Sequence, residues 1–430
     1  MCTASYLIQM SRHNAAESKG TKHRARTVLW VLWPVMLVGG MLLSPRHLDS
    51  MVWQRPDIWG LDRSVINQAI SSAVRDNRYP RQITVSNAHR RLPATLHYNI
   101  DPELQQSVMA VFADRKDGGP DYGIFVALDP ENGDVLALVN HRRQSKSVTN
   151  LALRATYPSA SVFKIVTASA AVDLGRVNAN SVIPFNGKTT SLYRKNVLHH
   201  KNNKWTRYLP LSASFGKSVN TVFGRLGLEY VGAEALLDYA NRFGFNQGLN
   251  GDFAVDLSRA QPDPEDDWSV VEAASGYTRE TTMSPVHGAL LAASIVNGGR
   301  LVRPSLIDSI TDENGIVLYA NDELLSHRVI EAHSAGQLQD MMADTVLNGT
   351  ARKHFRNFFR GNLSDVRVGG KTGTLYGTNP KGMYDWFVGY AQRGDRKLAY
   401  AALCINQEKW RVKSAHVARK AIEHYFTDRN

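Results

Sequence analysis

Three short strings combine hydroxyl, amine and amide side chains at spacings that suit acyl transfer. In chain order they are Ser161–Lys164 (Ser-Val-Phe-Lys), Ser218–Asn220 (Ser-Val-Asn) and Lys371–Thr374 (Lys-Thr-Gly-Thr). The first supplies a hydroxyl nucleophile and an amine on the same helical face, because residues three apart in a helix are neighbours. The second adds a hydroxyl and an amide, and the third adds a cation and two hydroxyls. Together they predict a serine nucleophile that is activated by a lysine base.

The segment around the first string predicts a helix that is buried on every side. Apolar residues occur on all helical faces of the run 162–172, in which Lys164 is the only charged residue, and Gly175 marks the end. Burial disfavours an ammonium group and lowers its pKa, so we expect Lys164 to be a base for Ser161. The alternative is a Ser that caps the helix and a Lys that extends to solvent.

A second Ser-x-x-Lys string, Ser214–Lys217, gives an internal comparison. It contains Gly216 inside its turn, and no buried apolar helix of matching quality follows it. We therefore assign the nucleophile to Ser161 and not to Ser214.

In the second string, the hydroxyl of Ser218 and the amide of Asn220 are one residue apart and can point into the same cleft. The hydroxyl is suited to pass a proton between the base and a leaving amine, and the amide to hold a substrate backbone group. The alternative is that the string caps the segment 221–230.

In the third string, Gly373 removes a side chain where another part of the chain must approach closely. Thr372 and Thr374 offer hydroxyl donors, and Lys371 offers a positive charge for a substrate carboxylate. The alternative is a polar edge strand. A phosphate-binding loop is excluded because the required upstream glycine is absent.

Composition and charge describe a globular protein with an excess of positive charge. The chain has 430 residues, 43% of them hydrophobic, and a formal net charge of +12, which favours anionic surroundings. We find no zinc-type Cys/His spacing and no nucleic-acid-binding string, so neither a metal nor a nucleic acid partner is expected. The two cysteines, Cys2 and Cys404, indicate no disulfide, and Cys404 lies in an apolar run that predicts a buried strand.

A basic stretch surrounds the adjacent residues His199 and His200. Its cationic members are Lys188, Arg194, Lys195, Lys201, Lys204 and Arg207. We interpret it as a solvated loop, and the alternative is contact with an anionic glycan or lipid.

The N-terminal part predicts a membrane anchor. Residues 27–44 carry no charge and, as a helix, would span roughly 27 Å, which is close to the hydrocarbon thickness of a bilayer. The tail 1–26 is basic and therefore expected in the cytoplasm, so that the rest of the chain is exported. No cleavage site of the small-x-small type follows the run. Residues 45–95 are expected to be a spacer, and residues 96–430 to form the catalytic domain.

The order of predicted elements favours an α+β fold. A helix is expected from Asp101-Pro102 to Asp114, followed by strands over 122–128 and 135–139 in a hairpin. Two more strands are expected over 385–390 and 398–405, and a terminal helix over 414–426. Strands at both ends with helices between them predict one antiparallel sheet assembled from distant segments, with a helical insert.

From about Leu96 to Phe426 the chain resembles the penicillin-binding proteins of the DD-transpeptidase family. The resemblance is carried by the three strings, by 99–105 at the start of the domain, by the hairpin 127–135, by 274–303 and by 385–390. The sequence is most similar to the transpeptidase module of bifunctional murein synthases. The residues between the predicted anchor and this module are too few for the glycosyltransferase domain of those synthases. The resemblance implies the penicillin-binding and serine β-lactamase-like fold.

The resemblance also implies roles for the site residues and partners for the chain. Ser161 would attack the penultimate D-alanine carbonyl of a peptidoglycan stem peptide, with Lys164 as base, Ser218 as proton relay and Asn220 orienting the substrate. Lys371, Thr372 and Thr374, around Gly373, would bind the terminal carboxylate, and backbone N–H groups of Ser161 and Thr374 would form an oxyanion hole. Expected partners are stem peptides, β-lactam antibiotics, the bacterial inner membrane and a glycosyltransferase or other wall-synthesis proteins. No cofactor is implied.

Two alternative functions remain open. The same chemistry with water as acceptor would give a DD-carboxypeptidase, whereas a β-lactamase is disfavoured because no convincing Glu-x-x-x-Asn loop lies between Asn220 and Lys371. A penicillin sensor or scaffold without turnover is the non-enzymatic alternative.

Overall fold

The computed structural model of the chain describes residues 61–86, 91–114, 119–144, 149–321, 325–408, 410 and 412–427. All of them belong to one compact unit that extends from Pro56 to Asn430. Within these ranges, no helix combines the length and the apolar character that crossing a membrane requires. The predicted tail 1–26, the predicted anchor 27–44 and the first part of the predicted spacer lie outside the described residues.

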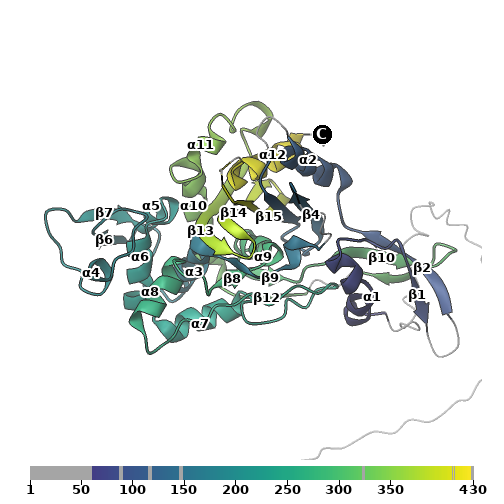
Figure 1. Ribbon diagram of the computed structural model, residues 1–430, viewed down its shortest axis with the longest axis horizontal. Coiled ribbons are helices and arrows are strands. Elements are labelled where there is room, and N and C mark those ends of the chain that lie inside the picture. Colours follow the sequence, from purple (N-terminus) through teal and green to yellow (C-terminus); the bar gives the residue numbers. More distant parts are fainter. Residues whose placement is uncertain are drawn as a thin grey trace, which may run out of the picture. The chain divides into compact units, whose positions relative to one another are not determined.

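A five-stranded antiparallel sheet combines strands from both ends of the described chain (Figure 1). Its order is β13 (Arg367–Thr378), β14 (Lys381–Arg393), β15 (Arg396–Asn406), β3 (Tyr122–Leu128) and β4 (Val135–Arg142). The predicted hairpin is β3 and β4, and the two later predicted strands lie within β14 and β15. The predicted α+β architecture, with one antiparallel sheet made from distant segments, is confirmed.

Side chains of the sheet alternate between two apolar cores, because successive residues of a strand point to opposite faces. Ile124 and Leu403 belong to the larger core, and their neighbours Phe125 and Cys404 belong to the smaller one. Cys404 is fully buried, as predicted.

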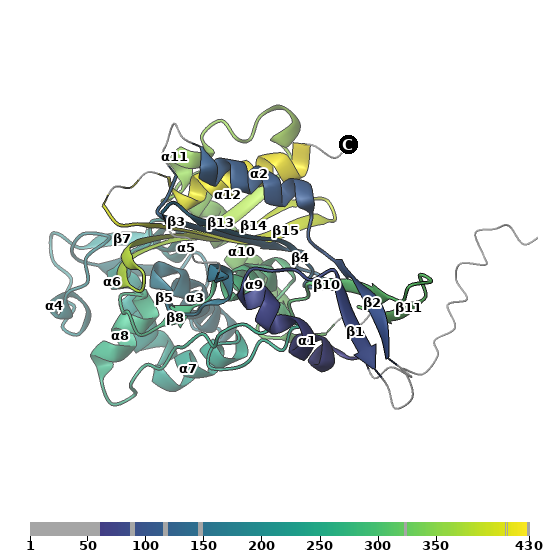
Figure 2. The same ribbon diagram turned by 45° about the vertical axis from the view of Figure 1, so that its right-hand side comes forward.

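Helices cover both faces of the sheet (Figure 2). Helix α9 (Pro285–Val296) packs in the larger core, and α2 (Pro102–Ala113) and α12 (Ser414–Thr427) pack in the smaller one. The carboxylate of Asp101 caps α2 by accepting hydrogen bonds from two backbone N–H groups, which confirms the predicted helix start.

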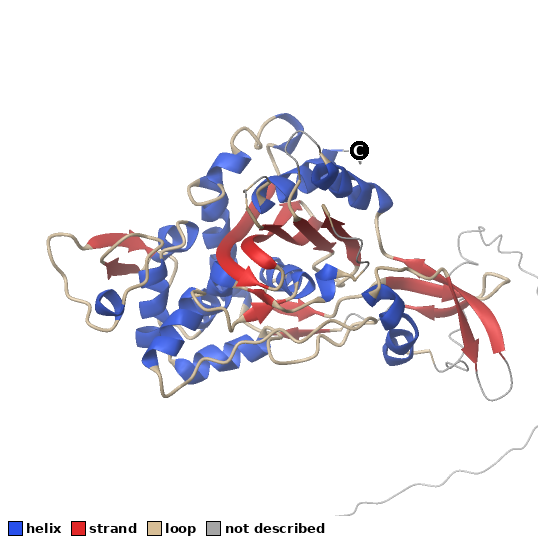
Figure 3. Cartoon of the chain, viewed as in Figure 1, coloured by secondary structure: helices blue, strands red, loops and turns tan. Residues whose placement is uncertain are grey.

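The segment between β4 and β13 holds most of the remaining helices (Figure 3). They are α3 (Lys164–Asp173), α4 (Arg194–Val197), α5 (Leu211–Gly216), α6 (Asn220–Arg225), a π-helix (Leu226–Val231), α7 (Ala233–Arg242), α8 (Asp267–Ser275), α10 (Ala332–Leu347) and α11 (Arg352–Phe355). The helix predicted around Ser161 begins as a 3₁₀ turn over Ala160–Phe163 and continues as α3. The positive φ of Ala160, 49°, accounts for the irregular start.

A second antiparallel sheet has the strand order β1 (Gln82–Ser86), β2 (Arg91–Tyr98), β10 (Ile307–Thr311) and β11 (Val317–Ala320). Helix α1 (Arg63–Arg75) buries Ile66, Ile70 and Val74. Strand β2 runs across the predicted boundary between residues 95 and 96, and that division of the chain remains a prediction. Three short strand pairs complete the fold: β5 (Tyr157–Pro158) with β8 (Thr282–Met283), β6 (Val182–Phe185) with β7 (Arg207–Pro210), and β9 (Arg300–Val302) with β12 (Ser326–Arg328).

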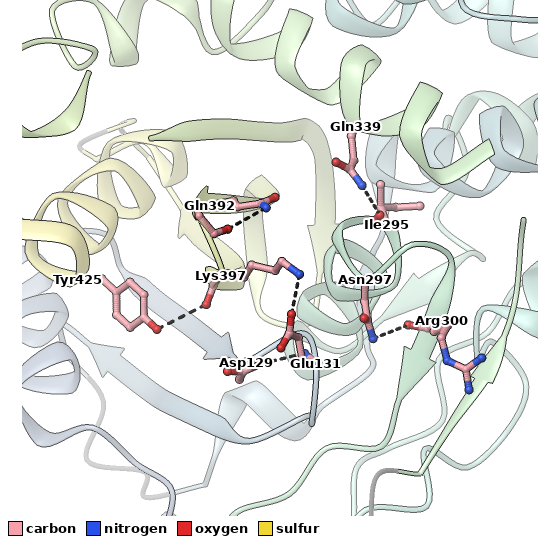
Figure 4. A network of polar contacts seen from close by, with 10 residues as sticks. Asp129, Glu131, Ile295, Asn297, Arg300, Gln339, Gln392, Lys397 and Tyr425 are labelled. Carbon is pink, nitrogen blue, oxygen red and sulfur yellow. Dashed lines mark hydrogen bonds and ion pairs between the residues drawn. The ribbon is translucent and has the colours of Figure 1, made fainter. Parts of the chain in front are cut away.

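Polar contacts tie the sheet to the helices that surround it (Figure 4). Lys397 at the start of β15 forms an ion pair with Glu131 in the β3–β4 turn, with 2.6 Å between Nζ and Oε1. The backbone carbonyl of Lys397 also accepts a hydrogen bond from the Tyr425 hydroxyl of α12. Gln339 of α10 donates to the carbonyl of Ile295 in α9 at 2.9 Å. The Gln339 contact ties α10 to α9, and α10 also packs against β13.

Candidate active site

Ser161 and Lys164 lie on one turn that leads into α3. The Nζ atom of Lys164 is 2.7 Å from Oγ of Ser161. Lys164 is fully buried, whereas Ser161 is half-buried, so a substrate can reach the hydroxyl while the amine stays shielded from water. In the comparison string, Lys217 is exposed at the end of α5. The structure therefore places a buried amine beside Ser161 and not beside Ser214.

The contacts of Lys164 suit a neutral amine. Its Nζ lies 2.8 Å from Oδ1 of Asn220 and also contacts the carbonyl oxygen of Ser275. No carboxylate of the described residues forms an ion pair with it. Burial, and secondarily the positive charge of Lys371, hold the pKa of Lys164 well below its ordinary value. A neutral amine donates two hydrogen bonds, to Asn220 and Ser275, and its lone pair accepts the third from the Ser161 hydroxyl.

The turn that presents Ser161 is fixed by a glycine from another helix. Gly276 follows α8 in the left-handed region, with φ of 65°, and a Cβ placed on it would lie 1.9 Å from the carbonyl oxygen of Ala160. The backbone N–H of Ser159 donates to the carbonyl of Thr281 at 2.9 Å. From the sheet, Nε1 of Trp386 donates to the carbonyl of Pro158, also at 2.9 Å. The nucleophile is thus held from α8, from the α8–β8 loop and from β14.

Ser218 and Asn220 lie at the junction of α5 and α6, where Ser218 adopts a positive φ of 55°. The Asn220 side chain accepts from Lys164, and its Nδ2 donates to the carbonyl of Thr190 at 2.9 Å. The Ser218 hydroxyl lies 2.9 Å from Nζ of Lys371. The two side chains therefore approach different lysines of the site.

Lys371 is the second buried amine of the site. It lies on β13, its Nζ contacts Oγ of Ser218 and the carbonyl of Thr372, and it faces the ring of Phe215 at 5.5 Å. Burial lowers the pKa of Lys371 from an ordinary value of 10.5 to about 7. Lys371 therefore changes its charge near neutral pH.

The rest of the third string places β13 next to the Ser161 turn. A Cβ on Gly373 would lie 3.2 Å from the carbonyl oxygen of Ser159 and 3.3 Å from Cβ of Ala160, which confirms the predicted close approach. The hydroxyl of Thr372 lies 2.6 Å from that of Thr350. Thr372 and Thr374 line a cavity of about 310 Å³ together with Thr350, Lys353, His354, Asp385, Trp386, Trp410, Lys413 and Ala415.

The structure brings all eight predicted site residues into one neighbourhood. It adds groups that sequence reasoning missed: the Ser275 carbonyl, Gly276, Thr350 and the rings of Phe215 and Phe223 next to the two amines. Only Gly276 had a signal in the sequence, as a glycine that ends a helical pattern. Among the described residues, no group of three or more His, Cys, Asp or Glu is placed to hold a metal ion. The arrangement can deprotonate the Ser161 hydroxyl through a buried amine and attract an anion beside it.

Known proteins share sequence and fold with this chain. A family model described as the penicillin binding protein transpeptidase domain matches residues 123–423. The chain is 27% identical over 320 residues to the peptidoglycan D,D-transpeptidase PbpA of Mycobacterium tuberculosis, a match that covers 67% of this chain and 62% of that protein. It is 27% identical over 286 residues to stage V sporulation protein D of Bacillus subtilis, covering 59% of this chain and 40% of that protein. The chain thus spans less than two thirds of the length of these relatives.

Solved structures share the fold. The penicillin G acyl-enzyme complex of penicillin-binding protein A from M. tuberculosis has a TM-score of 0.60 at 25% identity, covering 77% of this chain and 80% of that one. The D,D-transpeptidase domain of a peptidoglycan glycosyltransferase from Eggerthella lenta has a TM-score of 0.63 at 22% identity, covering 77% and 82%. The predicted transpeptidase fold is therefore confirmed for the described residues.

We predict that Gly276→Ala reduces β-lactam acylation of Ser161 by roughly 100-fold, because the new methyl group would displace the Ala160–Ser161 turn and misplace the hydroxyl. Gly175→Ala is the matched control: its φ of 66° equals that of Gly276 within a degree, but no atom lies within 4 Å of its added Cβ. The measurement is the second-order rate constant of labelling by fluorescent penicillin. Equal rates in the two variants would show that Gly276 does not position the nucleophile.

Proposed function

Because the chain belongs to the penicillin-binding protein transpeptidase family, we propose that it is a peptidoglycan D,D-transpeptidase. It cross-links stem peptides through an acyl-enzyme on Ser161, and β-lactams acylate the same hydroxyl. The observation that carries the proposal is the 2.7 Å contact between Ser161 and the fully buried amine of Lys164. The transpeptidase name of the PbpA relative and the acyl-enzyme structure of penicillin-binding protein A support the same reaction class.

Acylation begins with proton transfer from the Ser161 hydroxyl to the neutral amine of Lys164, as the oxygen attacks the carbonyl carbon of the penultimate D-alanine. The carbonyl electron pair moves onto its oxygen, which the backbone N–H groups of Ser161 and Thr374 stabilise. One such donor typically contributes about 10²–10³ in rate. Two features support an oxyanion hole between Ser161 and Thr374. Strand β13 is the edge strand of its sheet, and Gly373 lies against the turn that precedes Ser161.

Collapse of the tetrahedral intermediate breaks the bond to the terminal D-alanine. The leaving amine takes the proton that Lys164 received, and the Ser218 hydroxyl relays it. Lys371 orients this hydroxyl through the 2.9 Å contact. An amine of a neighbouring stem then attacks the ester carbonyl, its proton returns through Lys164 to the Ser161 oxygen, and the cross-link is released.

Substrate binding uses the remaining groups of the site. Asn220 orients the peptide backbone, and Lys371, Thr372 and Thr374 bind the terminal carboxylate. The ammonium form of Lys371 provides the opposite charge, and the two threonines provide hydroxyl donors. A β-lactam resembles the D-Ala-D-Ala end, but its leaving nitrogen stays tethered to the acyl group after ring opening and obstructs the acceptor.

The proposal includes a location at the bacterial inner membrane. Residues 27–44 form the single anchor, the basic tail before it stays in the cytoplasm, and the catalytic domain lies outside the cytoplasm. The basis is the uncharged apolar run and the excess of Lys and Arg before it.

We predict that Ser161→Ala abolishes the covalent adduct with ampicillin, because no other hydroxyl of the site contacts Lys164. Ser214→Ala, the equivalent change in the Ser-x-x-Lys string whose lysine is exposed, is the control and should be labelled like the unmodified protein. Intact-protein mass spectrometry measures the adduct. An undiminished adduct in the Ser161→Ala protein would contradict the assigned nucleophile.

We predict a bell-shaped pH dependence for the second-order rate constant of acylation. Lys164 acts in its neutral form, so the rate rises with pH through its lowered pKa. Lys371 attracts the carboxylate in its charged form, so the rate falls as pH rises above about 7. Lys371→Arg should move the falling limb to higher pH, because a guanidinium keeps its proton. Lys217→Arg is the control, and an unchanged falling limb in the Lys371→Arg protein would remove Lys371 from this role.

We predict that a pentapeptide ending in D-Ala-D-Ala yields both free D-alanine and cross-linked dimers, because the acyl group passes to an amine. Liquid chromatography with mass spectrometry separates the products. Free D-alanine without dimers would identify a carboxypeptidase instead. Labelling by penicillin without any product would identify a sensor.

A further inference from the structure

An exposed, purely basic segment lies next to the candidate active site. No Asp or Glu occurs between Asp173 and Glu229. Within this stretch, residues 186–208, which we call the basic lobe, expose Lys188, Arg194, Lys195, Lys201, Lys204 and Arg207. No carboxylate in the part of the chain that the structure describes forms an ion pair with these six side chains. The positive charge of the lobe is therefore not neutralised within the fold.

The lobe also exposes aromatic rings, and hydrogen bonds hold the backbone that carries them. Trp205 is 74% exposed, Tyr193 62% and Tyr208 59%. The turn that carries Trp205 is held to Asn186, whose Nδ2 donates to the carbonyl of Lys201 at 3.0 Å and whose Oδ1 accepts from Thr206 at 2.9 Å. The lobe follows β6 and ends in β7, and these two strands pair with each other (Figure 1). The rings are thus exposed by a hydrogen-bonded framework.

The aliphatic side chains of the lobe point inward. Leu192 and Val197 form a small core with Val271 of α8. A surface that inserts into a bilayer needs a continuous apolar face, which the lobe does not present. Its outer surface combines ammonium and guanidinium groups, aromatic rings and the amides of Asn202 and Asn203. This combination suits a hydrated polymer that carries both sugars and carboxylates.

The base of the lobe is bonded directly to the site. The backbone N–H of Asn220 donates to the carbonyl of Thr189, and its side-chain Nδ2 donates to the carbonyl of Thr190, both at 2.9 Å. The same Asn220 side chain holds Lys164. A polymer bound on the lobe would therefore have its attached peptides close to the nucleophile.

We propose that the basic lobe binds the carboxylate-bearing glycan–peptide polymer whose stem peptide reacts at Ser161. The proposal rests on the proposed function for the identity of the polymer. The six cations pair with the free carboxylates of neighbouring stems, and Trp205, Tyr193 and Tyr208 pack against the apolar faces of sugar rings. Because these ion pairs are exposed, added salt screens them, and we expect binding to weaken as the salt concentration rises.

The test is co-sedimentation of the full chain in neutral detergent with intact cell-wall sacculi at low salt. The lobe variant carries Lys195→Glu, Lys201→Glu and Lys204→Glu. The control variant carries Arg81→Glu, Arg176→Glu and Arg303→Glu, three exposed positions outside the lobe that change the net charge equally. We expect the lobe variant to lose at least about tenfold in affinity and the control to bind like the unmodified protein. Penicillin acylation should be equal in all three, which shows that each is folded.

Two further arms use other probes. Sacculi whose carboxylates have been converted to amides should bind the unmodified protein as weakly as intact sacculi bind the lobe variant. Vesicles of phosphatidylglycerol and phosphatidylcholine should bind less than intact sacculi. Trp205→Ala should weaken binding to sacculi without changing its salt dependence.

The proposal is overturned if the lobe variant retains its affinity, if amidation has no effect, or if the lobe binds the vesicles and not the sacculi. The last outcome would identify a membrane surface instead. Failure of penicillin to label the unmodified protein would contradict the proposed function, whereas loss of sacculus binding alone would not affect it.

Discussion

The structure of the site depends on the burial of the Lys164 amine without a carboxylate partner. A charged ammonium in that position would lack a counter-charge, so burial favours the neutral form. The fold compensates with three polar contacts, to Ser161, Asn220 and the Ser275 carbonyl, and these match the two donors and one acceptor of an amine. The same contacts that make burial of Lys164 tolerable therefore leave its lone pair facing the nucleophile.

That arrangement needs parts of the chain that are distant in sequence. The turn before α3 carries Ser161, the α5–α6 junction carries Ser218 and Asn220, and β13 carries Lys371. The central sheet acts as the frame, because β13 is its edge strand and β14 contacts the turn through Trp386. Glycines occur where these segments approach most closely, so the geometry is set by backbone contacts as well as by side chains.

The sequence predicted the parts of this structure that have local signals. Helical and strand patterns located α2, α12 and four strands of the central sheet, β3, β4, β14 and β15. An apolar helix with one lysine predicted the burial of Lys164. The β1–β2–β10–β11 sheet and the paired short strands were missed. All of these strands except β2 have only two to five residues, which carry little periodicity. The contact of Ser218 with Lys371 depends on tertiary packing, so spacing in the sequence does not reveal it. Gly276 is recognisable as a helix end, but its close approach to Ala160 is also a tertiary feature.

Asn220 touches the buried base with one end of its amide and the carbonyl of Thr190 with the other. A single amide therefore connects the base to the segment that carries the basic lobe. If occupancy of the 186–208 surface shifts residues 189–190, the proton affinity of Lys164 shifts with it. Thermodynamic linkage requires the reverse as well. If binding on the lobe changes the affinity of the site for its ligand, binding at the site changes the affinity of the lobe for the polymer by the same factor.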